Sequence, residues 1–139
     1  ILKEGKMEVA EKRWNKFYEK LGYLCYAIAS SDKKVTLPEI AKLKDLVKTE
    51  WLALEETEDA YGSDAAYQIE ILFDWLEENL PPSAYAFEEF SDFVKTNEDF
   101  FSPELKQKVM TTVDKIASAY AGKNKTELTM LFQLHKLLN

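Results

Sequence analysis

Apolar side chains recur three and four residues apart along almost the whole chain, and this spacing constrains the fold more than any other feature. In the first part of the chain it is formed by seven residues, Trp14, Phe17, Tyr18, Leu21, Leu24, Cys25 and Ile28. The spacing places them on one face of an α-helix, whereas a half-buried strand would alternate with a period of two. No stretch of the chain shows that alternation, so we predict an all-α protein.

Helix start and stop signals divide the 139 residues further. The predicted helices cover about 7–31, 37–48, 63–80, 83–96, 102–121 and 124–139, with an acidic loop over residues 51–63. Ser63, Ser83 and Ser102 are the expected N-caps. Trp75 is expected to face inward from the third long helix. Because 46% of the residues are apolar, the chain can build a core. We therefore predict one domain, residues 1–139, folded as a compact bundle of about six to seven helices.

The corner between the first two helices carries a capping box. Glu39 follows Thr36 by three residues, so each side chain is expected to bond the backbone amide of the other residue. Asp32 lies in the turn just before this box. The two carboxylates at this corner either bind a cation or only accept hydrogen bonds from backbone amides. Both alternatives remain open.

The last two helices repeat the pattern of the first two. A shift of 88 residues aligns Ile28–Ser30 with Ile116–Ser118 and Glu39 with Glu127, and Asn124 completes a second capping box. It also aligns Asp32 with Tyr120. The half-repeats span roughly residues 7–50 and 102–139 and flank an acidic helical middle, residues 51–101. We therefore predict an internal pseudo-twofold duplication with two central long helices.

The net charge of −7 is unevenly distributed. Residues 1–49 hold 11 basic and 7 acidic side chains, residues 50–104 hold 1 and 16, and residues 105–139 hold 6 and 2. A nucleic-acid partner would require clustered lysine and arginine, so that class is not expected. No apolar run reaches the roughly 18 residues of a membrane span. The expected partner is a basic protein surface or a second copy of the chain.

Six carboxylates form the candidate partner-binding face on the third and fourth helices. They are Glu70, Asp74, Glu77, Glu78, Glu88 and Asp92. Like charges one turn apart cost about 0.2–0.5 kcal/mol per pair in isolated helices. A docked basic partner would justify that penalty, and lysines of the flanking segments would neutralise the face equally well. Both alternatives remain open.

Catalytic signals are weak. His135 is the single histidine, and no Ser, Cys or Asp lies near it in sequence to form a nucleophile relay. Cys25 falls on the apolar stripe of the first helix, which predicts a buried thiol in a reducing cytoplasm. Acid–base catalysis by paired carboxylates would require a closed pocket. We predict that the chain is not an enzyme.

Residues 27–39, Ala-Ile-Ala-Ser-Ser-Asp-Lys-Lys-Val-Thr-Leu-Pro-Glu, resemble the signature of the TerB-like family of tellurite-resistance domains. Asp32, Val35 and Glu39 stand at matching positions, and Lys33 occupies the place of the family's glycine. The resemblance implies an acidic cytoplasmic domain of tellurite-resistance or stress-response systems. It also implies binding of a divalent cation, such as calcium, magnesium or manganese, by the acids of this corner.

Such an ion takes about six or more oxygen ligands, which is more than Asp32 and Glu39 supply. Glu127 is the candidate third ligand if the halves are related as proposed. Two hypotheses for a binding protein follow. One is a TerB-like cation-binding domain, and the other is an acidic interaction module without a metal.

Overall fold

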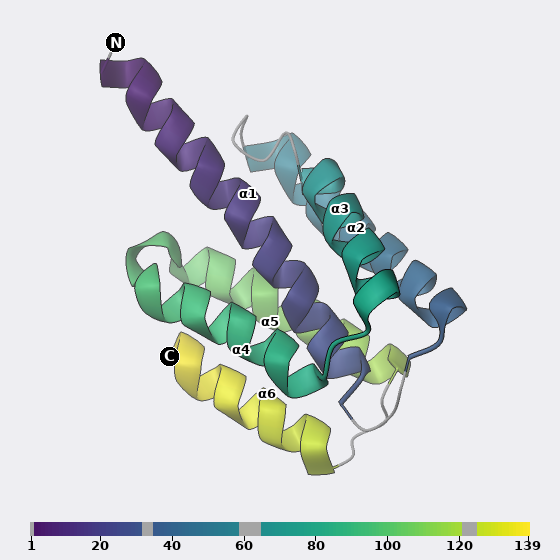
Figure 1. The fold of residues 1–139 in the computed structure, drawn as a ribbon. Helices are drawn as coiled ribbons and strands as arrows, with labels where there is room; N and C mark the ends of the chain where they lie inside the picture. Colours follow the sequence, from purple (N-terminus) through teal and green to yellow (C-terminus); the bar gives the residue numbers. More distant parts are fainter. Residues whose placement is uncertain (1, 32–34, 59–64, 121–124) are drawn as a thin grey trace.

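The computed structural model describes residues 2–31, 35–58, 65–120 and 125–139, and helices fill most of these ranges (Figure 1). The elements in chain order are α1 (Leu2–Ala29), α2 (Leu37–Glu58), α3 (Ala65–Asn79), α4 (Ser83–Thr96), the short 3₁₀ helix η2 (Glu98–Phe100), α5 (Pro103–Tyr120) and α6 (Lys125–Leu138). The described ranges contain no strand. The predicted all-α helical bundle is therefore confirmed.

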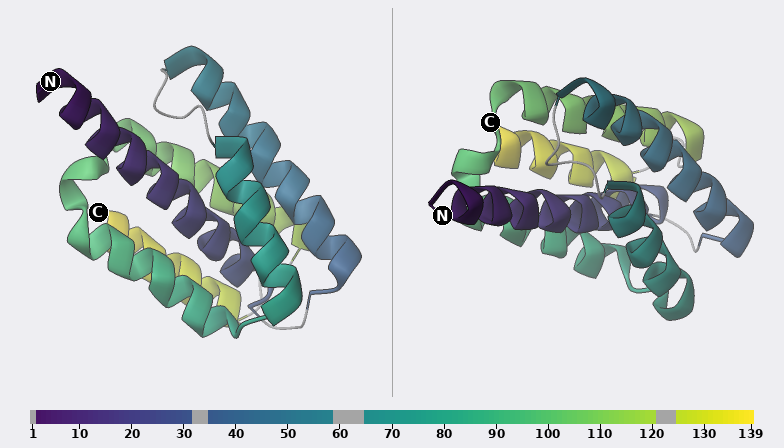
Figure 2. Two further views of the ribbon diagram at one scale, coloured as in Figure 1. Left: turned by 45° about the horizontal axis from the view of Figure 1, so that its top comes forward. Right: turned by 90° about the horizontal axis from the view of Figure 1, so that it is seen from above.

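Helix α1 runs through the middle of the bundle. It packs against α3 and α4 on one side and against α2 and α5 on the other (Figure 2). Every residue from Leu21 to Ala29 is buried, and this stretch contains no charged side chain. A helix enclosed on all sides must be apolar all round, which explains the composition of this segment. The other long helix expected at the centre, α5, packs against α1 and α2.

Phe17 lies at the centre of an aromatic cluster that joins α1, α2, α4 and η2. Its ring centroid lies within 6.4 Å of six other aromatic centroids, those of Trp14, Tyr18, Trp51, Phe93, Phe100 and Phe101. The pairs are tilted or edge-to-face, the arrangements that the ring quadrupoles favour. Residues distant in sequence are thus fixed around one buried side chain.

Helix α2 continues well past residue 48, so the loop predicted from residue 51 onward is wrong as far as Glu58. Trp51 is fully buried, and its indole Nε1 donates a hydrogen bond to Thr112 Oγ1 of α5 at 3.0 Å. Glu50 forms ion pairs with two lysines of α5, at 2.7 and 3.6 Å. Since these contacts hold the second half of α2 on α5, tertiary packing overrides the loop-like acidic composition.

The N-cap predictions had mixed outcomes. Ser102 Oγ accepts a hydrogen bond from the amide of Leu105 at 3.1 Å, which confirms this cap of α5. The prediction for Ser83 is wrong, because the N-cap of α4 is Pro82, which makes no side-chain cap bond. Ser63 lies outside the described residues.

The two helix corners lie at the same end of the bundle, where α1 meets α2 and α5 meets α6 (Figures 1 and 2). Tyr120, near the second corner, donates a hydrogen bond from its hydroxyl to the carbonyl oxygen of Glu39 at the first, at 3.3 Å. The residue that aligns with Asp32 in the sequence repeat therefore reaches across to the partner corner. The pseudo-twofold relation itself stays a prediction.

Thr112→Val should lower the free energy of unfolding by about 1–3 kcal/mol, because it leaves the buried indole N–H of Trp51 without its acceptor. Thr111→Val is the matched control, since the Thr111 hydroxyl donates an exposed hydrogen bond to the carbonyl oxygen of Gln107 in its own helix. Urea unfolding measures both. Equal losses in the two variants would show that the Trp51–Thr112 bond is not what holds α2 on α5.

Candidate functional site

The predicted capping box of Thr36 and Glu39 is present at the first helix corner. The Glu39 carboxylate accepts a hydrogen bond from the amide of Thr36 at 2.9 Å, and the Thr36 hydroxyl accepts one from the amide of Glu39 at 3.3 Å. This reciprocal pair satisfies two amides that the start of α2 would otherwise leave open. Asp32, the other candidate ligand at this corner, lies outside the described residues.

Glu127, the third candidate metal ligand, lies in the first turn of α6 and is completely buried. Its predicted capping partner, Asn124, lies outside the described residues. Within the part of the chain that the structure describes, no three or more His, Cys, Asp or Glu side chains are grouped to hold a metal ion. A cation site completed by Asp32 therefore stays a prediction.

The six carboxylates predicted as one acidic face lie in different environments. Glu70 is bound by two lysines of α2, with Lys48 Nζ at 2.8 Å and Lys44 Nζ at 3.1 Å. Hydrogen bonds from Lys48 and then Lys44 hold the pKa of Glu70 below its usual 4.5. For Glu70, the alternative of neutralisation within the fold is the observed one.

Two of the other carboxylates belong to a different surface. Glu88 and Asp92 line a groove between α4 and α6, together with Lys95 and Lys136. On α3, Glu77 is half-buried, whereas Asp74 and Glu78 are exposed. In the described part of the chain, no lysine or arginine nitrogen lies within 4 Å of the Asp74 or Glu78 carboxylate. We call Asp74 and Glu78 the acidic pair.

Helix α3 is held close to α1 through its inner face. Four buried side chains form that face, Ile69, Leu72, Phe73 and Leu76. Gly22 of α1 permits the close approach, because a Cβ atom at this position would collide with the side chain of Leu72. The register of α3 on α1 is therefore fixed by packing, which also fixes what its other face presents to solvent.

The outer face of α3 is apolar as well as acidic. Tyr67, Ile71 and Trp75 stand on successive turns and are 65%, 47% and 37% exposed. We call these three residues the α3 ridge. Its last member contacts Tyr23 of α1 edge-to-face, with ring centroids 5.8 Å apart, and Tyr23 in turn contacts the half-exposed Tyr85 of α4 at 6.1 Å. The exposed rings of Trp75 and Tyr85 are thus joined through Tyr23, which is itself buried.

The inward orientation predicted for Trp75 is wrong, and this error hid the ridge. Positions 67, 71 and 75 are spaced by four residues, as are the core positions Ile69 and Phe73, so α3 has two apolar stripes. The core of the bundle lies on one side of α3, so only one of the two stripes can face it. The second stripe was the signal in the sequence that could have identified this surface.

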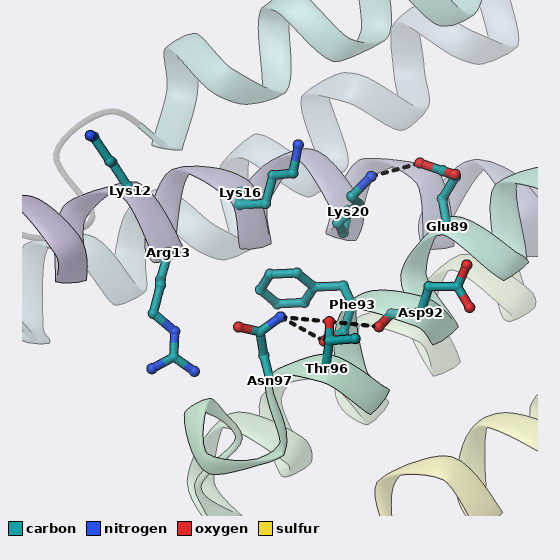
Figure 3. A pocket seen from close by; sticks show the side chains of 9 residues that line it. All are labelled: Lys12, Arg13, Lys16, Lys20, Glu89, Asp92, Phe93, Thr96 and Asn97. Carbon is teal, nitrogen blue, oxygen red and sulfur yellow. Dashed lines mark hydrogen bonds and ion pairs between the residues drawn. The ribbon is translucent and has the colours of Figure 1, made fainter.

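A groove of about 510 Å³ separates α1 from α4 (Figure 3). Nine residues line it, Lys12, Arg13, Lys16, Lys20, Glu89, Asp92, Phe93, Thr96 and Asn97. Lys20 Nζ lies 2.6 Å from Glu89 Oε1, and Arg13 makes two bonds to Asp99, at 2.9 and 3.0 Å. The other two lysines point away from Phe93 (Figure 3). The charges that face this groove are therefore largely matched within the protein.

The candidate reactive groups occupy ordinary structural positions. Cys25 is buried as predicted, and burial raises the pKa of its thiol well above the usual range. A thiol in that state is a poor nucleophile. His135 is exposed on α6, and its Nδ1 lies 3.2 Å from the side-chain amide of Asn139. Among the helices that the structure describes, none is long and apolar enough to cross a membrane.

Comparison with known proteins found no match. No family model matches this chain, and no curated protein or solved structure matches it. The resemblance to the TerB-like family, based on residues 27–39, therefore stays a prediction.

The lowered pKa of Glu70 predicts an acid-dependent loss of stability. As the pH falls, the unfolded chain takes up the proton first, so the contribution of Glu70 is present above its unfolded pKa and is lost below its folded pKa. Glu70→Gln should reduce the fall in unfolding free energy between about pH 7 and about pH 3, measured by urea unfolding. Glu78→Gln is the matched control, because no described lysine or arginine nitrogen lies within 4 Å of the Glu78 carboxylate, and it should reduce that fall less. The same reduction in both variants would contradict the assigned role of Glu70.

Proposed function

We propose that this chain is a non-enzymatic binding domain whose α3 outer face docks a basic protein partner. The observation that carries the proposal is the exposure of three large apolar side chains beside two exposed carboxylates that form no ion pair with a described lysine or arginine. Isolated exposed apolar residues are common, but a row of them with a charged border is typical of an interaction site.

The charge of α3 favours a cationic partner. The helix holds four acids and no basic residue. Two lysines of α2 bind one of these acids, Glu70, and the acidic pair stays open to solvent. Lysine or arginine side chains of a partner would be attracted to the acidic pair during encounter. In the complex, the same charge pairs would fix how the partner is aligned on α3. The ridge would supply the apolar area that such a contact needs for affinity.

The resemblance to the TerB-like family supports a second candidate, a divalent-cation-binding domain of stress or tellurite-resistance systems. Its specific support is the capping box at Glu39 and the location of both helix corners at one end of the bundle. The site would combine Asp32 and Glu39 with Glu127. In this function the ion would join the two ends of the chain.

The docking proposal predicts that the effect of a charge reversal on binding depends on where the charge is reversed and not on the net charge of the protein. Asp74→Lys with Glu78→Lys should weaken binding of a labelled polylysine peptide about tenfold or more, measured by fluorescence anisotropy at low salt. Glu104→Lys with Asp114→Lys places the same charge change at exposed positions of α5 and should have a much smaller effect. Equal weakening by the two double variants would mean that only net charge matters, and the proposal would fail.

The cation candidate predicts a rise in melting temperature on addition of calcium, magnesium or manganese. A ligand present at about 100 times its dissociation constant adds about 2.7 kcal/mol to the free energy of unfolding. For a domain of this size, that raises the melting temperature by several degrees. Asp32→Asn should abolish the rise. Glu39→Gln should also reduce it, while a glutamine keeps the capping hydrogen bond. No shift in the wild type, or equal shifts in the wild type and Asp32→Asn, would rule out this candidate.

A further inference from the structure

The α3 ridge has the geometry of one side of a helix–helix contact. Its three side chains are spaced by four residues, which forms a continuous row inclined to the helix axis. Between Tyr67 and Trp75 the helix rises about 12 Å, two full turns. Rows of this kind pack into the groove between the corresponding rows of a second helix. Asp74 lies beside Trp75 at the end of the row, and Glu78 lies on the next turn of the helix.

We propose that the occupant of this face is a basic amphipathic α-helix of another protein. Its apolar side chains pack along both sides of the ridge, and its lysine or arginine side chains face Asp74 and Glu78. The half-exposed Tyr85, joined to Trp75 through the buried ring of Tyr23, lengthens the contact toward α4. This inference rests on the proposed docking function and adds the structural class of the partner.

Three other occupants fit the face less well. An extended peptide would need free backbone groups to pair with, and the backbone of α3 is bonded within its own helix. An anionic membrane surface would be repelled by the acidic pair. In a twofold contact between two copies, the same patch faces itself, so the acidic pairs would lie close to one another without any base on α3 to compensate. A cationic helix meets none of these obstacles.

The test uses the full chain and a synthetic peptide of about 18 residues in which leucine and lysine repeat with the helical period. A scrambled peptide of the same composition has the same charge but no apolar face. Fluorescence anisotropy should show that the helical peptide binds about tenfold or more tightly than the scrambled peptide. Equal binding of the two peptides would overturn the inference.

A matched pair of apolar variants locates the contact. Tyr67→Gln with Ile71→Gln should weaken binding of the helical peptide about tenfold or more. Leu128→Gln with Phe132→Gln removes two equally exposed residues, also spaced by four, from α6 and should change binding less than about twofold. Equal losses in the two double variants would contradict the assigned surface. Circular dichroism confirms that each variant keeps its helices.

Two further results separate this inference from the docking function on which it rests. Binding of polylysine should be insensitive to the ridge variant, because that binding depends on charge alone. If polylysine binding requires the acidic pair but the helical peptide has no advantage, the docking function stands and the helical partner is wrong. Sedimentation that shows a dimer of the wild type, lost in the ridge variant, would assign the face to a second copy and overturn the inference.

Discussion

The enclosure of the last part of α1, from Leu21 to Ala29, is the constraint on which the rest of the structure depends. A helix without a solvent-facing side cannot hold charge, and the stretch from Leu21 to Ala29 holds none. Helices α2, α3, α4 and α5 all pack against α1, and Phe17 connects aromatic residues of α2 and α4 into one cluster. Because the inner face of α3 packs on α1, the orientation of its outer face toward solvent follows from the fold.

Periodicity and capping chemistry predicted the helical class and most helix positions, because both depend on local spacing. The capping box of Thr36 and Glu39 is a clear example, since three residues of separation are sufficient to define it. The length of α2 was missed because it depends on Trp51 meeting Thr112, a contact across 61 residues of sequence. No local rule contains that information.

The candidate site was predicted only in part, because it too depends on contacts between residues that are distant in sequence. The sequence identified the acidic residues of α3, but it treated Glu70 and Asp74 as equivalent. Their difference comes from α2, whose lysines reach Glu70 and leave Asp74 exposed. Trp75 was assigned to the core because apolar residues usually are, and its exposure becomes evident only when the side of α3 that faces α1 is known. The surface therefore emerges from tertiary structure combined with sequence pattern.

The central claim is that the outer face of α3 is the binding surface of this domain. The most direct measurement is a map of backbone amide shifts by nuclear magnetic resonance during titration with the helical leucine–lysine peptide. The account predicts that the largest changes occur along α3 from Tyr67 to Glu78 and at Tyr23 and Tyr85. Largest changes instead at the groove between α1 and α4, or at the corner near Glu39, would contradict it.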